Sequence, residues 1–169
     1  LALALPGHTS LIEQITDTLP PARVAPHRLT QALLNILINS GKPVRESYGE
    51  VRIWAKFKGD SNAIQLGITD NGCGMTEEVK NRVFEPFFTT KTRGIGTGLG
   101  LTLVHSIVKS AGGTIDIKSQ LGQGTEIVLT LPIGSCTQDK PSIDAHSNQI
   151  SANVEIDHPS IQSLHPNIL

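Results

Sequence analysis

Cysteine is scarce in this sequence of 169 residues, and its placement excludes two classes of small protein. The two cysteines, Cys73 and Cys136, lie far apart and form no CxxC pair. This spacing rules out a disulfide scaffold and a cysteine zinc site. It fits a reducing compartment, so we expect a cytoplasmic location, although a longer parent protein could be anchored to a membrane.

Long apolar runs and an excess of one charge are also absent. No stretch approaches the roughly 18 apolar residues that a membrane helix needs. The apolar opening at residues 1–5 stops at Pro6 and has no basic residue before Arg23, unlike a signal peptide. The net charge of −1 argues against nucleic-acid binding. Because no initiator methionine is present, we expect the chain to be a fragment of a longer protein.

The hydrophobic periodicity predicts an α+β fold in which helices pack on one face of a mixed sheet, an α/β sandwich. The predicted helices span about 11–19, 26–40, 77–84 and 98–111. The predicted strands span about 51–57, 64–68, 115–117 and 127–131. Periodicity is lost after residue 133, so the sequence predicts a domain over 1–133 and a disordered or loosely packed tail over 134–169.

The sequence DNGCGM at residues 70–75 follows a predicted strand. The Asp70 carboxylate can accept from an exocyclic amine, and Gly72 and Gly74 allow a flat ligand to approach the backbone. An Asp-Asn-Gly turn is also ordinary turn chemistry. On this motif alone, a ligand site and a simple turn both remain open.

Glycines recur with a period of two in GIGTGLG, residues 94–100, directly before a predicted helix. Free backbone N–H groups and the positive end of a helix dipole together favour an anion such as a phosphate. The pattern is neither that of a phosphate-binding P-loop nor that of a dinucleotide fold. A flexible hinge is the alternative interpretation.

Polar amides form a row on the predicted helix over 26–40. Asn35 and Asn39 are four residues apart and therefore share a face, which Gln31 extends. Amide oxygens beside a phosphate site can hold Mg²⁺, which prefers oxygen ligands. The alternative is an ordinary solvated helix face.

The segment FEPFFTTK, residues 84–91, contains three of the six aromatic residues of the chain. This concentration indicates a docking patch for the loop itself or for a partner, unless the rings belong to the core. The charged end of Lys91 could reach a phosphate.

In this order, the four motifs resemble the ATP-binding catalytic domain of sensor histidine kinases. That family belongs to the Bergerat-fold ATPases, together with type II topoisomerases, Hsp90 chaperones and MutL-type repair proteins. The resemblance covers about residues 8–133, and the wording of FEPFFTTK is most similar to kinases of the nitrogen-regulation type. The matching segments are the N box (28–40), the first glycine box (70–75), the F box (84–91), the second glycine box (96–101) and a last glycine motif (122–125).

The resemblance implies a role for individual residues. Asp70 would accept the adenine amine, with support from Thr125 through water. Asn39 would hold Mg²⁺ on the phosphates, with Asn35 beside it and Lys91 on the phosphate side. The remaining residues that the resemblance places at the nucleotide are Gly72, Gly74, Met75, Lys42, Gly96, Thr97, Gly98, Leu99, Gly100 and Leu101.

The same resemblance implies a protein histidine kinase that binds Mg-ATP and transfers the γ-phosphoryl group to a histidine on a separate dimerisation helix. None of the six histidines stands in the acceptor context of the family, so we expect that helix upstream of this fragment. The domain alone would then be inactive, and its partners would be the acceptor domain and the receiver domain of a response regulator. Asn35 stands where ATP-hydrolysing relatives carry a glutamate, which favours transfer over hydrolysis.

Two alternatives remain open in the sequence. The link over residues 20–29 is short, which raises the possibility that an edge strand of the sheet is missing. That shortness motivates a degenerate nucleotide-binding or interaction module without kinase activity. An anti-sigma-type serine kinase shares the fold, although FEPFFTTK argues against it.

Overall fold

The computed structural model describes residues 9–40, 49–91 and 96–134. The elements in these ranges are β1 (Thr9–Ile15), α1 (Pro26–Asn39), β2 (Gly49–Lys58), the short helix η2 (Gly59–Ser61), β3 (Ala63–Asp70), α2 (Glu77–Arg82), α3 (Gly100–Ser110), β4 (Thr114–Gln120) and β5 (Gly124–Pro132).

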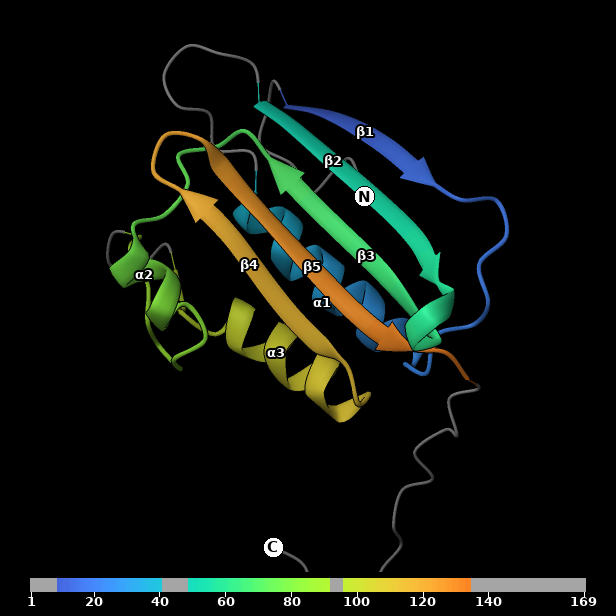
Figure 1. Cartoon of the computed structure of the whole chain (residues 1–169). Helices are drawn as coiled ribbons and strands as arrows, with labels where there is room; N and C mark the ends of the chain where they lie inside the picture. Colours follow the sequence, from blue (N-terminus) through green and yellow to red (C-terminus); the bar gives the residue numbers. More distant parts are fainter. Residues whose placement is uncertain (1–8, 41–48, 92–95, 135–169) are drawn as a thin grey trace, which may run out of the picture. The chain divides into compact units, whose positions relative to one another are not determined.

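The strands form one five-stranded sheet in the order β1-β2-β3-β5-β4 (Figure 1). β1 pairs with β2 in parallel, and the other pairs are antiparallel, so the sheet is mixed. This arrangement confirms the predicted α/β sandwich.

The core lies between the sheet and the helices α1 and α3. Helix α1 begins at Pro26, whose ring suits the first turn of a helix, and it buries one apolar stripe. Helix α3 does the same, and both stripes contact the inward residues of β2, β3 and β5. The buried helix residues are Ala32, Ile36 and Leu37 of α1 and Val104, Ile107 and Val108 of α3.

The prediction of a helix over 11–19 is wrong, because residues 9–15 form the edge strand β1. Leu11, Ile12 and Ile15 fit helical spacing, but an isolated segment of this length gains little as a helix. The open edge of β2 instead offers backbone partners along the whole segment, from Thr9 opposite Gly49 to Ile15 opposite Ala55. Residues 9–15 thus supply an edge strand of the sheet, ahead of the short link over 20–29.

The register of β3 explains why an acidic residue faces the helices. Side chains alternate along a strand, so Ile64, Leu66, Ile68 and Asp70 point to one face. Ile68 is buried in the core, and Asp70 is the last residue of the same row, opposite Thr125 of β5. The apolar row thus ends in a carboxyl group that lies under the C-terminal end of α1.

Two predictions lie outside the described residues. They concern Lys42 and, apart from Gly134, the tail over 134–169. None of the helices in the described ranges combines the length and apolarity that a membrane crossing requires.

Candidate functional site

The end of β3, the end of α1 and the turn before α3 enclose a cavity of about 590 Å³. The predicted site residues that line it are Asn35, Asn39, Asp70, Gly72, Gly74, Met75, Lys91, Gly96, Thr97, Gly98, Gly100, Leu101 and Thr125. Leu99 is not among the lining residues, and its side chain is exposed. The structure therefore brings together residues that are up to 90 positions apart in the sequence.

Asp70 is the carboxylate of this cavity. The Gly72 N–H donates to Asp70 Oδ1 at 2.8 Å. Burial is the main influence and raises the pKa of Asp70, while hydrogen bonding by the Gly72 N–H, the Ser40 side chain and the Thr125 backbone opposes the rise. An ionised carboxylate accepts hydrogen bonds only, so the site suits a ligand that presents a donor such as an amine.

The backbone of Thr125 lies opposite Asp70 in the antiparallel pair of β3 and β5. The hydroxyl oxygen lies 2.9 Å from Ser119 Oγ, within hydrogen-bond distance. The predicted support of the nucleotide by Thr125 through water stays a prediction.

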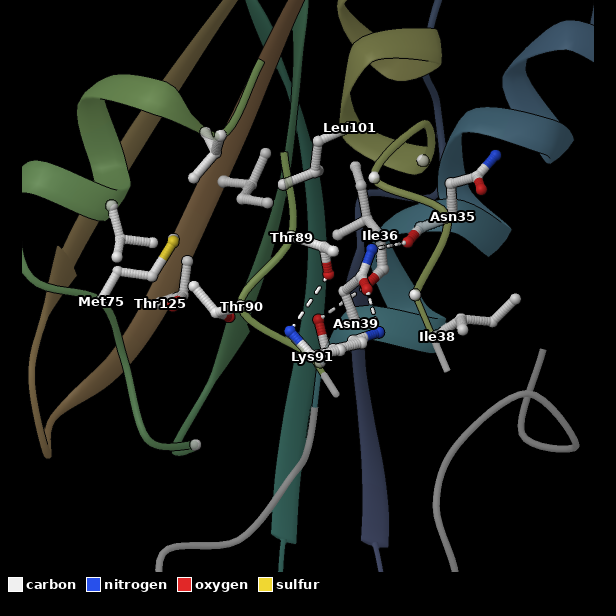
Figure 2. Close-up of a pocket in the computed structure, with 18 of the residues that line it drawn as sticks. Asn35, Ile36, Ile38, Asn39, Met75, Thr89, Thr90, Lys91, Leu101 and Thr125 are labelled. Carbon is white, nitrogen blue, oxygen red and sulfur yellow. Dashed lines mark hydrogen bonds between the residues drawn. The ribbon is translucent and has the colours of Figure 1, made fainter. Parts of the chain in front are cut away.

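Of the two amides of α1 that line the cavity, that of Asn39 faces Lys91 (Figure 2). Asn39 Nδ2 donates to the Asn35 carbonyl at 2.7 Å, and Asn35 Nδ2 donates to the Gln31 carbonyl at 2.9 Å. These bonds to the preceding turn fix the orientation of each amide. Lys91 Nζ donates to Asn39 Oδ1 at 2.7 Å, so a cationic group already contacts the amide oxygen of Asn39.

This donor set fits Mg²⁺ bound together with phosphates. Magnesium takes oxygen ligands and usually keeps waters and phosphate oxygens beside one or two protein groups. The orientation of Asn39 points its amide oxygen rather than its NH₂ group at Lys91, whose ammonium group donates to that oxygen. Within the described ranges, no three His, Cys, Asp or Glu residues cluster as a metal site of their own.

Two glycines near Asp70 are required by the protein's own backbone. Gly74 has a φ of +61°, and a side chain there would overlap the Gln120 carbonyl. Gly124 has a φ of +91°, and a side chain there would overlap the Asp70 carbonyl. The glycine motifs therefore let the loop after β3 and the β4–β5 turn approach each other beside the cavity.

The three phenylalanines of residues 84–91 have separate environments. The centroids of the Phe84 and His105 rings lie 5.0 Å apart. Phe88 lines the cavity, and the Arg82 guanidinium lies over its ring, 4.3 Å from the centroid. Phe87 is 75% exposed and has a φ of +65°. Of the three rings, Phe84 and Phe88 thus contact other side chains of the chain, while Phe87 is exposed.

Sequence comparison identifies the family to which these features belong. The family model described as "Histidine kinase-, DNA gyrase B-, and HSP90-like ATPase" matches residues 24–135. The chain belongs to this ATPase family. The match spans the cavity described above and both glycine-rich segments that line it.

The relatives of this ATPase domain are sensor kinases. Sensor histidine kinase ZraS of Escherichia coli (strain K12) is 39% identical over 123 residues, which cover 73% of this chain and 25% of that protein. Sporulation kinase B of Bacillus subtilis (strain 168) is 40% identical over 105 residues, covering 62% of this chain and 24% of that protein. The chain thus spans about a quarter of the length of these curated relatives.

Solved structures of histidine kinases have the same fold. Full-length ShkA in complex with AMPPNP has a TM-score of 0.63 and 28% identity, with 76% of this chain and 26% of that chain covered. The mycobacterial sensor histidine kinase MprB has a TM-score of 0.60 and 28% identity, with 75% and 83% covered.

Two features of the structure, the backbone conformation and a close neighbour, require glycine at position 98 of the ATPase domain. Its φ is +67°, and a side chain would overlap the Phe87 backbone, whose N–H donates to the Gly98 carbonyl at 3.1 Å. We expect Gly98→Ala to lower the free energy of unfolding by about 2–4 kcal/mol and to weaken ATP binding.

Gly122→Ala is the matched control for this substitution. Gly122 also has a positive φ, +79°, but no heavy atom lies near the position of an added side chain. Chemical denaturation should show a cost of only about 1–2 kcal/mol for the control. Equal losses in the two variants would show that the contact with Phe87 contributes nothing.

Sequence reasoning missed several residues that line the cavity. Ser40 comes from the end of α1, Val79 and Val83 from the segment of α2, and Ile127 from β5. Strand alternation could have indicated Ile127, which lies two residues after Thr125. The position of Ser40 depends on where α1 ends relative to β3, and no local pattern contains that information.

Proposed function

We propose that this chain is the ATP-binding catalytic module of a sensor histidine kinase. It binds Mg-ATP and transfers the γ-phosphoryl group to a histidine on a dimerisation helix elsewhere in the full-length protein. The phosphoryl group then passes to the receiver domain of a response regulator. The names of the curated relatives, sensor histidine kinase and sporulation kinase, support this assignment.

One observation carries the proposal, namely the two chemically different sides of a single cavity. Asp70 provides an acceptor for an amine on one side. The other side has the amide oxygen of Asn39, the ammonium group of Lys91 and the glycine turn that includes Gly98. A nucleotide triphosphate has the same two ends, an amine-bearing base and a chain of anionic phosphates.

The residues support transfer by binding and orientation. Asp70 would hold the base, while Lys91 and the N–H groups at the start of α3 would stabilise negative charge on the phosphates. In the transfer step, a P–N bond forms to the acceptor histidine as the bond between the γ-phosphorus and the bridging oxygen breaks, and ADP leaves. Asn35 cannot act as a base, so the site has no carboxylate at that position to activate water.

Magnesium would be held by Asn39, with Asn35 beside it. The ion neutralises phosphate charge when bound. Lys91 would have to leave Asn39 Oδ1 for the ion to use that oxygen, and the phosphates would offer its ammonium group an alternative partner.

The test supplies the missing acceptor. We would incubate the purified chain with Mg²⁺ and γ-labelled ATP, with and without the acceptor-histidine domain of a related sensor histidine kinase. We expect label on the acceptor that is lost in acid and retained in base, as a phosphohistidine should be. Acid-stable label would instead indicate a serine kinase, and ATP binding without any transfer would indicate a degenerate nucleotide-binding module.

A further inference from the structure

Lys91 contacts the oxygen atom that a magnesium ion would need. Its Nζ donates to Asn39 Oδ1 at 2.7 Å, and this bond joins the end of the segment 84–91 to the end of α1 (Figure 2). Among the described residues that line the cavity, Lys91 is also the only one with a cationic side chain. In the nucleotide-free chain, a positive charge therefore already lies on the proposed metal ligand.

The ammonium group and a metal ion would compete for this oxygen. Asn39 Nδ2 donates to the Asn35 carbonyl at 2.7 Å, so the amide keeps one orientation and presents one oxygen. Magnesium binds oxygen at about 2.1 Å, so an ion on this atom would lie less than about 5 Å from the ammonium nitrogen. Positive charges this close repel each other near a protein surface, which disfavours simultaneous binding.

The ammonium group of Lys91 can change partners without a movement of the backbone. The Lys91 N–H donates to Thr89 Oγ1 at 3.1 Å, which holds the start of the side chain in place. The stem then passes the glycine turn before α3, where a Cβ added at Gly96 would lie 3.1 Å from both Lys91 Cβ and Lys91 Cδ. A lysine stem is flexible, so its ammonium group can rotate from Asn39 to a phosphate held at this turn.

The layout of the cavity indicates which phosphate can attract Lys91. Asp70 lies on the side that would take the base, and Lys91 and Asn39 lie on the other side. In ATP the γ-phosphate is the group farthest from the base, so it is the phosphate that reaches Lys91. ADP lacks this group, and its shorter phosphate chain would leave the ammonium group on Asn39.

We propose that Lys91 is a specificity-determining residue that couples magnesium binding to the presence of a γ-phosphate. This inference rests on the proposed function. Without a γ-phosphate, the ammonium group stays on Asn39 Oδ1 and competes with the ion. With a γ-phosphate, the ammonium group has an anionic partner, and Asn39 Oδ1 becomes available to magnesium. The cavity thereby favours Mg-ATP over Mg-ADP, which promotes the release of ADP after transfer.

The experiment compares Lys91→Met with the wild-type chain by calorimetric titration of ATP and ADP, each with Mg²⁺ and with a chelator. The measured quantity is the gain in affinity on adding Mg²⁺, which should be larger for ATP than for ADP in the wild type. In Lys91→Met, the gain for ADP should rise about 10-fold, because the competing ammonium group is absent. Metal-free ATP should bind about 10-fold more weakly, because a hydrogen bond to a charged group is lost.

A second readout follows the ligand atom itself. In NMR spectra of the wild type, the side-chain amide signal of Asn39 should shift when Mg²⁺ is added to the ATP complex, but not when it is added to the ADP complex. In Lys91→Met it should shift in both complexes. This measurement does not depend on transfer to an acceptor.

Two further variants locate the effect. When Lys91→Met is combined with Asn39→Ala, the raised gain for ADP should disappear, because the oxygen for which the cations compete is absent. Lys109→Met is the matched control, since it removes the same charge at an exposed position near the end of α3, outside the cavity. It should leave the gains for both nucleotides unchanged.

The outcomes separate this inference from the proposed function. A wild-type chain that binds neither nucleotide overturns both. Equal gains for ATP and ADP in a wild-type chain that binds them overturn only the role of Lys91. A Lys91→Met variant that binds ATP more weakly but has an unchanged gain for ADP also overturns it, because Lys91 would then act only as a phosphate ligand.

Discussion

Asp70→Asn is expected to weaken ATP binding by about 100-fold and to leave the fold intact. One carboxylate oxygen accepts from the Gly72 N–H at 2.8 Å, and the other would accept the amine of the base. An asparagine has one oxygen and one NH₂ group. Whichever way the amide is turned, one of the two donors meets the NH₂ group, so the substitution is not conservative despite its equal size.

The stability of this variant separates a binding role from a structural one. Burial raises the pKa of Asp70 above its ordinary value of 3.8. Between 3.8 and the higher value, the folded chain holds a proton that the unfolded chain has released, so stability falls as pH rises through this window. Above the window, ionisation of Asp70 destabilises the fold by a constant amount.

An asparagine lacks this ionisation, so we expect a Tm at pH 7 equal to or above that of the wild type. Thermal unfolding and titration with a fluorescent ATP analogue would measure both quantities. Asp116→Asn is the matched control, because it makes the same change at an exposed position of β4 outside the cavity. Retained affinity in Asp70→Asn would contradict the role of Asp70, and a much lower Tm would identify it as a structural residue instead.

Much of the fold could be predicted because its signals are local. Helix α1 has a proline at its start and a continuous apolar stripe, and α2 begins as predicted after Thr76, whose hydroxyl accepts from the Val79 N–H. The four antiparallel strands show clear alternation. The edge strand β1 could not be recognised because Leu11, Ile12 and Ile15 fit both periods, and the partner that decides between them lies about 40 residues further along the chain.

The sequence predicted those site residues that belong to a recognisable motif. It could not predict the contacts between residues that are far apart in the chain. The sequence indicates Asn39 and Lys91 separately, but their hydrogen bond joins residues 52 positions apart. Ser40 is the last residue of the N-box match, but the motif does not show that its side chain is buried at the cavity, because that depends on where α1 ends. The glycine motifs were recognised from the sequence. The reason why Gly74 and Gly124 must be glycine was not, because a side chain there would overlap backbone that only the tertiary structure brings close.

Asn39→Ala is expected to abolish the contribution of magnesium to nucleotide binding. The Asn39 oxygen is the ligand that the orientation of the α1 amides leaves available, and loss of a metal ligand should reduce the gain in ATP affinity on adding Mg²⁺ by about 10- to 100-fold. Phosphoryl transfer to a supplied acceptor should fall at least as much, because charge neutralisation on the phosphates is lost.

The measurement is the ratio of the ATP affinity with Mg²⁺ to the ATP affinity with a chelator. This ratio separates the contribution of the metal to binding from that of the base. Gln31→Ala is the matched control, since Gln31 lies on the same row of α1 but contributes to the amide chain only through its backbone carbonyl. Binding in the chelator should be equal or slightly stronger in Asn39→Ala, because Lys91 is released from Asn39 Oδ1 and can bind phosphate. A wild-type ratio in Asn39→Ala would mean that the ion is held by other groups, and equal loss with and without Mg²⁺ would mean that Asn39 shapes the cavity instead of holding the metal.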